Sequence, residues 1–172
     1  MSSTTLGILE FQEHYVERIW GGRRLATLFG KDLPVDVPVG EAWLISDHPS
    51  APSIIQSGVF AGGTLHDLVK QAPSALLGVC ARPTPPNRFP LLLKLLDAHD
   101  VLSVQVHPDD DQAKRFGETD IGKTEMWYVI HADEGASLYC GLQPELTDSD
   151  VRAAVESNCL ERHLIAHTVQ EG

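Results

Sequence analysis

The residues of this sequence that could do chemistry begin in the segment VLSVQVH, residues 101–107. Polar and apolar residues alternate there, which predicts a β-strand with Ser103, Gln105 and His107 on one face. Alternate side chains on one face are about 6.6 Å apart, because a strand rises about 3.3 Å per residue. One small ion could therefore reach both Gln105 and His107, and the pair is a candidate metal site.

A carboxylate in the next alternating segment could complete that set. Residues 123–130, KTEMWYVI, predict a strand with Lys123 and Glu125 on one face. An amide oxygen, an imidazole nitrogen and a carboxylate suit a borderline divalent cation, zinc rather than calcium because imidazole is present. Alternatively, Gln105 and His107 satisfy each other in a polar seam, and Glu125 pairs with Lys123 on a solvated face. Spacing alone leaves both interpretations open.

Short strands separated by turn signals make up much of the remaining sequence. Thr64 and Thr147 are the candidate N-caps of two short helices. The pattern predicts a mainly β fold, an antiparallel barrel or jelly roll with a few short helices. The further candidate strands lie at residues 40–47, 89–97, 136–141 and 161–169.

Lys94 stands out in the leucine-rich strand FPLLLKLLD, residues 89–97. A lysine among such neighbours is costly to bury unless it reaches solvent, pairs with an acid or meets an anion. Lys94 is therefore a candidate anion contact.

Composition limits the classes of function. With 172 residues and 42% hydrophobic content, the chain can bury one sizeable core. The 13 basic against 24 acidic residues give a net charge of −11, which argues against nucleic-acid and anionic-membrane partners. Cys80, Cys140 and Cys159 form no CxxC pattern, so we expect no disulfide framework and a reducing, cytoplasmic environment. The N-terminus has no basic start followed by an apolar run, so we expect no export signal.

Several motifs, in order along the chain, resemble one family. The segments LSVQVHPDD and GKTEMWY are similar to the signature of the type I phosphomannose isomerases, which are zinc-dependent cupin enzymes. The upstream motifs WGG, GEAW, SDHP and FPLLLKLLDA resemble the same family in its order. These motifs lie at residues 102–110, 122–128, 20–22, 40–43, 46–49 and 89–98.

The resemblance implies a single cupin-type domain over residues 1–172 that interconverts mannose 6-phosphate and fructose 6-phosphate. It implies one zinc ion per chain, held by Gln105, His107 and Glu125. It further implies that Lys123 and Glu125 are catalytic, and that Ser103, Lys94 and Lys123 bind the sugar phosphate.

The sequence departs from the family pattern near its end. The family's fourth ligand is a histidine in a later motif resembling PAGTVHA, whereas His163 and His167 lack that motif here. The family's C-terminal arginine is also missing. We therefore expect a chain without its C-terminal strands that binds zinc loosely and shows negligible isomerase activity. We also expect it to associate with itself or with another chain through an exposed edge. The alternative is a cupin domain with reduced catalytic activity that serves as a sugar-phosphate-binding or regulatory domain.

Overall fold

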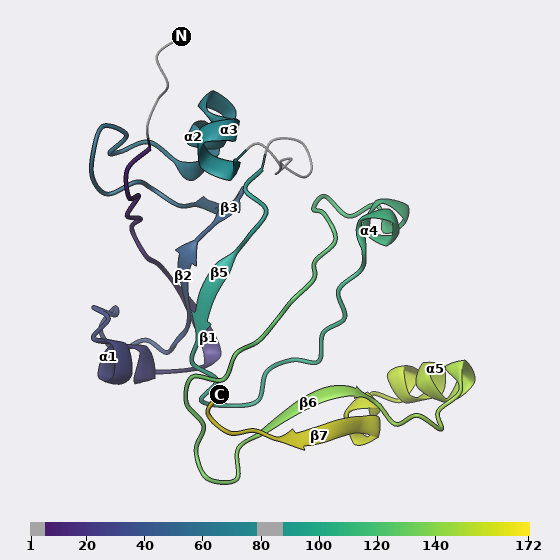
Figure 1. The fold of residues 1–172 in the computed structure, drawn as a ribbon. Helices are drawn as coiled ribbons and strands as arrows, with labels where there is room; N and C mark the ends of the chain where they lie inside the picture. The colour runs from purple at the N-terminus through teal and green to yellow at the C-terminus, as the bar shows by residue number, and fades with distance from the viewer. Residues whose placement is uncertain (1–5, 79–87) are drawn as a thin grey trace. The chain divides into compact units, whose positions relative to one another are not determined.

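The computed structural model describes residues 6–78 and 88–172, in two compact units that are considered separately. Unit 1 comprises residues 1–103 and unit 2 residues 104–172 (Figure 1). Cys80 lies outside the described residues, and Cys140 and Cys159 are free thiols. In the described ranges, no helix has both the length and the apolar character needed to cross a membrane.

Unit 1 contains a three-stranded antiparallel sheet with the order β1-β2-β5, a two-stranded ribbon of β3 and β4, and three short helices. Its elements are β1 His14–Gly22, α1 Arg24–Phe29, β2 Val39–Ile45, β3 Asp47–His48, β4 Ala51–Pro52, α2 Leu65–Gln71, α3 Pro73–Leu77 and β5 Leu93–Leu96.

The register of this sheet separates an apolar face from a polar one. Ala42 on β2 pairs with Leu95 on β5, and Trp43 pairs with Lys94. Because side chains alternate along a strand, these pairs point to opposite faces. Ala42 is fully buried in a core with Leu25 of α1, Leu33 of the following loop and Val39 of β2 itself. Trp43 and Lys94 therefore lie on the face away from this core.

Helix α1 has no side-chain cap from its own N-cap residue, Arg23. Its first N–H, that of Arg24, donates to Asp97 Oδ2 at 2.7 Å, directly after β5. Gly22 allows this approach, because a Cβ there would lie 2.7 Å from the same oxygen. The aspartate is 5% exposed. A buried carboxylate distant in sequence thus supplies the cap.

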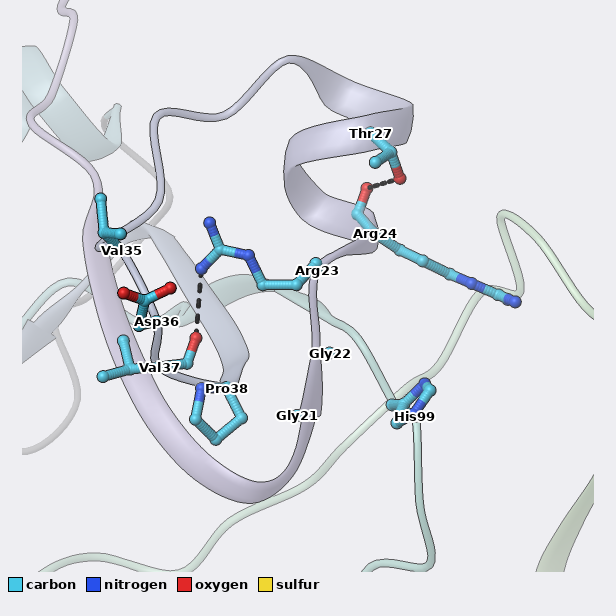
Figure 2. A pocket seen from close by; sticks show the side chains of 10 residues that line it. All are labelled: Gly21, Gly22, Arg23, Arg24, Thr27, Val35, Asp36, Val37, Pro38 and His99. Atoms are coloured by element: carbon cyan, nitrogen blue, oxygen red, sulfur yellow. Dashed lines mark hydrogen bonds between the residues drawn. The ribbon is translucent and has the colours of Figure 1, made fainter.

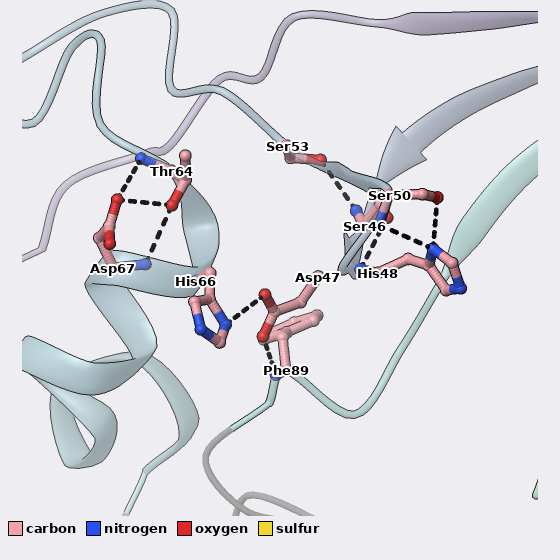
Figure 3. Close-up of polar contacts among 9 residues, drawn as sticks. All are labelled: Ser46, Asp47, His48, Ser50, Ser53, Thr64, His66, Asp67 and Phe89. Carbon is pink, nitrogen blue, oxygen red and sulfur yellow. Dashed lines mark hydrogen bonds and ion pairs between the residues drawn. The ribbon is translucent and has the colours of Figure 1, made fainter. Parts of the chain in front are cut away.

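Helix α2 begins with the predicted cap. Thr64 Oγ1 accepts the Asp67 N–H and the Asp67 carboxylate accepts the Thr64 N–H, which is a capping box (Figure 3). The following polar cluster ties α2 to β3, because Asp47 accepts from His66 Nδ1 at 2.9 Å and from the Phe89 N–H at 2.7 Å (Figure 3). Asp47 is 5% exposed. Its buried carboxylate therefore connects β3 to α2 and to the segment at Phe89 within unit 1.

Unit 2 combines an antiparallel pair of strands with short helices. Helices α4 and α5 both begin with a capping box, at Asp109 and at Thr147. Its elements are α4 Asp110–Phe116, β6 Ser137–Leu142, α5 Asp148–Glu156, the 3₁₀ helix η1 Leu160–His163 and β7 Leu164–Thr168.

The structure differs from the sequence prediction in its secondary-structure content. Helix and strand are about equally represented among the described residues, so a mainly β chain is not what the structure shows; antiparallel sheets are confirmed. The strands predicted over residues 101–107 and 123–130 have no regular secondary structure. Most of their apolar side chains are exposed, with Val106 at 91% and Met126 at 92%. A strand needs a hydrogen-bonded ladder, and unit 2 forms one only between β6 and β7 in its described residues.

Candidate functional site

The segments carrying His107 and Glu125 are brought together by a helical excursion. After Pro108 the chain forms helix α4 and then turns back. The returning segment is joined to the outgoing one where the Lys123 N–H donates to the Pro108 carbonyl at 3.0 Å. Gly122 makes the return tight, because a Cβ there would lie 2.4 Å from the Asp109 backbone. The closed excursion places the residue before Pro108 beside the residues after Gly122.

His107, Glu125 and Lys123 form one contiguous cluster in unit 2. His107 Nε2 lies 3.3 Å from Glu125 Oε2, and Lys123 Nζ lies 2.6 Å from Glu125 Oε1. Their side chains are 25%, 29% and 39% exposed. One carboxylate is thus shared between an imidazole and an ammonium group, and all three side chains are partly exposed to solvent.

The geometry of this cluster leaves both interpretations of the sequence open. The ion pair of Lys123 with Glu125 matches the structural alternative, and the approach of His107 to Glu125 matches the metal-site hypothesis. Gln105 lies on the same segment as His107 and is exposed. Among the described residues, no group of three histidine, cysteine or acidic side chains is placed to hold a metal ion.

Lys94, predicted as an anion contact, lies in a polar network on the sheet of unit 1. Its Nζ is 3.3 Å from Glu41 Oε2, which also accepts the Trp43 indole N–H at 2.6 Å. Arg18 Nε donates to the other oxygen, Oε1, at 2.9 Å. Ser103 also belongs to unit 1, at its last position, and is exposed.

Glu41 is the centre of this network and is 5% exposed. Burial alone would raise the pKa of the Glu41 carboxyl. The Trp43 indole donor, Lys94 and Arg18 outweigh burial and bring the pKa below its ordinary value. Glu41 is therefore a buried, ionised carboxylate that holds two cations.

Sequence reasoning gave no role to Glu41 or Arg18, although Glu41 belongs to the GEAW motif. The signal that could have found Glu41 is the alternation in VGEAWLI, residues 39–45, which places an acidic residue and a tryptophan on one face of a strand. Only the pairing of β2 with β5 reveals that this face also carries Lys94.

Unit 1 also has an open pocket of about 720 Å³ between the Gly21–Gly22 backbone, the start of α1 and the loop before β2. Arg23 reaches across it and donates to the Val37 carbonyl at 3.1 Å (Figure 2). It also donates to the Pro34 carbonyl at 2.5 Å. The Arg24 side chain, also on its wall, is directed away from Arg23 (Figure 2). The basic groups do not converge on one point, so the Glu41 network is the better-organised cationic site.

Comparisons with known proteins give one consistent family. Residues 8–136 match the family model of the phosphomannose isomerase type I catalytic domain. A mannose-6-phosphate isomerase of Streptococcus mutans is 46% identical over 133 residues, covering 77% of this chain and 39% of that protein. A probable mannose-6-phosphate isomerase of Bacillus subtilis, GmuF, is 41% identical over 144 residues, covering 83% and 43%.

The solved structures agree. The mannose 6-phosphate isomerase of Bacillus subtilis matches with a TM-score of 0.84 and 34% identity, over 95% of this chain and 50% of that one. A putative mannosephosphate isomerase of Archaeoglobus fulgidus matches with a TM-score of 0.76 and 26% identity, over 98% and 55%. The chain spans about two fifths of the length of the two curated relatives above. By its match over residues 8–136, it belongs to the family of type I phosphomannose isomerase catalytic domains.

Proposed function

We propose that this protein is a metal-dependent aldose-ketose isomerase that interconverts mannose 6-phosphate and fructose 6-phosphate. The observation that carries the proposal is the approach of His107 to Glu125, in a chain of the type I phosphomannose isomerase family. An imidazole and a carboxylate beside an ammonium group can bind a cation and move a proton. An aldose-ketose isomerisation needs both.

The donor set fits zinc. Two ligands at about 2.0–2.1 Å from a tetrahedral ion lie about 3.3–3.4 Å apart, and His107 Nε2 is 3.3 Å from Glu125 Oε2. Gln105, on the same segment as His107, would be the third ligand. One zinc ion per chain, when bound, would stabilise negative charge developing on the sugar oxygens.

The remaining side chains would hold the substrate and its proton. Lys123 Nζ lies 2.6 Å from Glu125 Oε1, so this pair would move a proton to or from a sugar carbon or oxygen placed beside it. Ser103, Lys94 and Lys123 are each a proposed phosphate contact. A few local cations suffice for this in a protein of net charge −11.

The proposal includes a single cupin-type domain over residues 1–172 with a jelly-roll fold. The similarity to the Bacillus subtilis isomerase structure and the antiparallel sheets support it. It also includes a cytoplasmic location, a sugar-phosphate substrate without nucleic-acid or membrane partners, and self-association. The acidic composition supports the exclusion of polyanionic partners.

An assay of fructose 6-phosphate formation from mannose 6-phosphate tests the proposal, with the Streptococcus mutans relative as positive control. We expect only trace turnover, which requires zinc and disappears in His107→Ala. The matched control is His131→Ala, because His131 is exposed and lies near Asp133 in the same unit. Turnover that survives His107→Ala would contradict the metal assignment.

A second candidate is a sugar-phosphate-binding or regulatory domain with reduced catalysis. The ion pair of Lys123 with Glu125 favours it, because it engages both proposed catalytic groups with each other. Tight binding of mannose 6-phosphate with no turnover at any zinc concentration would support this candidate over the isomerase.

A further inference from the structure

Arg18 and Lys94 flank one buried carboxylate. Arg18 donates to Glu41 Oε1 at 2.9 Å and Lys94 Nζ lies 3.3 Å from Oε2. Both cations remain accessible, because their side chains are 40% and 21% exposed, whereas that of Glu41 is only 6% exposed. Two positive charges against one negative charge leave these three side chains with a net charge of +1.

The backbone is shaped to deliver Arg18 to this position. Gly40 has no side chain, and a Cβ there would lie 2.6 Å from Arg18 Cβ and 2.6 Å from Trp20 Cζ3. The arginine stem therefore crosses the β2 backbone directly. The Trp43 indole, which donates to Glu41 Oε2 at 2.6 Å, holds the carboxylate from the other side. Edge contacts with His14 and His48 position that indole.

We propose that Glu41 is a positioning residue that holds Arg18 and Lys94 for one phosphate group, and that Arg18 is a phosphate contact of this site. This inference rests on the proposed function, which gives Lys94 to the sugar phosphate. Arginine presents a planar fork of donors that suits phosphate oxygens, and lysine adds a point charge. Because the carboxylate already orders both side chains, less conformational entropy is lost when the anion binds.

Binding of mannose 6-phosphate, mannose and inorganic phosphate to the 172-residue chain tests the inference by titration calorimetry. Arg18→Gln should weaken both phosphate ligands by about tenfold or more, as expected for a lost charge-assisted contact. Binding of mannose should stay unchanged, and Arg18→Lys should restore part of the loss. The charge-matched control is Lys70→Gln, on the exposed side of α2, which should change binding by less than about twofold because distant surface charges are screened.

The Glu41→Gln variant shows whether Glu41 acts by positioning Arg18 and Lys94 or only through its negative charge. It removes a negative charge, so a network acting only through charge would bind phosphate more tightly in this variant. Positioning predicts weaker binding instead. Tighter binding by Glu41→Gln, or an Arg18→Gln variant that binds like Lys70→Gln, would overturn the inference.

Lys94→Gln distinguishes failure of the inference from failure of the proposed function. If Lys94→Gln weakens mannose 6-phosphate and Arg18→Gln does not, the inference is wrong and the role of Lys94 stands. If Lys94→Gln leaves mannose 6-phosphate binding unchanged, the phosphate role that the proposed function gives to Lys94 is wrong. The inferred site of Arg18 and Lys94 is then wrong as well. If a variant does not fold, the Arg18 Nε–H NMR signal of the unmodified chain can be followed instead. The inference predicts that this signal shifts on titration with inorganic phosphate, and an unchanged signal would contradict it.

Discussion

His107 Nε2 lies 3.3 Å from Glu125 Oε2, although helix α4 separates the two residues in the sequence. The contact depends on the return of the chain at Gly122, where the Lys123 N–H meets the Pro108 carbonyl. An imidazole and a carboxylate at this separation can share a proton or a cation. The chemistry of unit 2 therefore depends on how tightly the excursion around α4 closes.

His107→Ala should remove most of the zinc bound by the chain and leave the fold largely intact, because His107 is part-exposed and packs in no core cluster of the described residues. Elemental analysis after equilibrium dialysis measures the stoichiometry. His131→Ala, which changes an exposed histidine of the same unit, should retain the metal. An unchanged stoichiometry in His107→Ala would place the metal elsewhere.

Lys123→Ala should weaken mannose 6-phosphate by about 1.5–3 kcal/mol, the usual value of a hydrogen bond to a charged group, and mannose by much less. Titration calorimetry with both sugars measures the difference. Lys114→Ala, an exposed lysine in the last turn of α4, controls for the loss of one positive charge. Equal losses for the two sugars would remove Lys123 from the phosphate site.

Glu41→Gln should destabilise unit 1 by about 1.5–3 kcal/mol at neutral pH, because it removes a buried charged acceptor from three donors. The pKa of Glu41 is lowered in the folded chain, so its stabilisation is present above the ordinary glutamate pKa of about 4.5. It is lost as the pH falls through the folded value. Denaturant unfolding at pH 7 to 3 should show the wild-type advantage narrowing in acid.

The control for that experiment is Glu17→Gln, since Glu17 is an exposed acid on the neighbouring strand β1. It should unfold like the wild type at every pH. A wild-type advantage over Glu41→Gln that widens in acid would contradict the assigned direction of the pKa.

Leu25→Ala should destabilise unit 1 by about 2–5 kcal/mol, because Leu25 is 1% exposed in the core and its truncation leaves a cavity. Leu28→Ala changes the same helix at a position that is 50% exposed. Thermal unfolding should show a much smaller effect for Leu28→Ala. Similar losses would contradict the assignment, because Leu→Ala does not lower helix propensity and only the burial of Leu25 distinguishes the two positions.

Local signals in the sequence predicted several elements well. Thr64 and Thr147 cap helices as expected. The predicted strand at residues 136–141 overlaps β6, and that at residues 161–169 contains β7. Helix α4 was missed, although Asp109 and Gln112 have the spacing of a capping box. Such signals act within a few residues, so they can be recognised without knowledge of the fold.

The candidate site was predictable only in part. Alternation placed Lys123 and Glu125 on one face, and the two do form an ion pair. Alternation could not show whether residues 101–107 would find a hydrogen-bonded partner, because pairing depends on segments distant in sequence. The contact of Arg18 with Glu41 could not be predicted either, because it follows from the antiparallel pairing of β1 with β2.

The cap that Asp97 provides to α1 has a consequence for the order of folding. A helix of six residues is too short to persist alone, and its first N–H finds its acceptor only after β5 has joined the sheet. Helix α1 should therefore form late and cooperatively with the docking of β5. In hydrogen exchange, the amide of Arg24 should open together with the β2–β5 ladder, and Asp97→Ala should release α1 to exchange on its own.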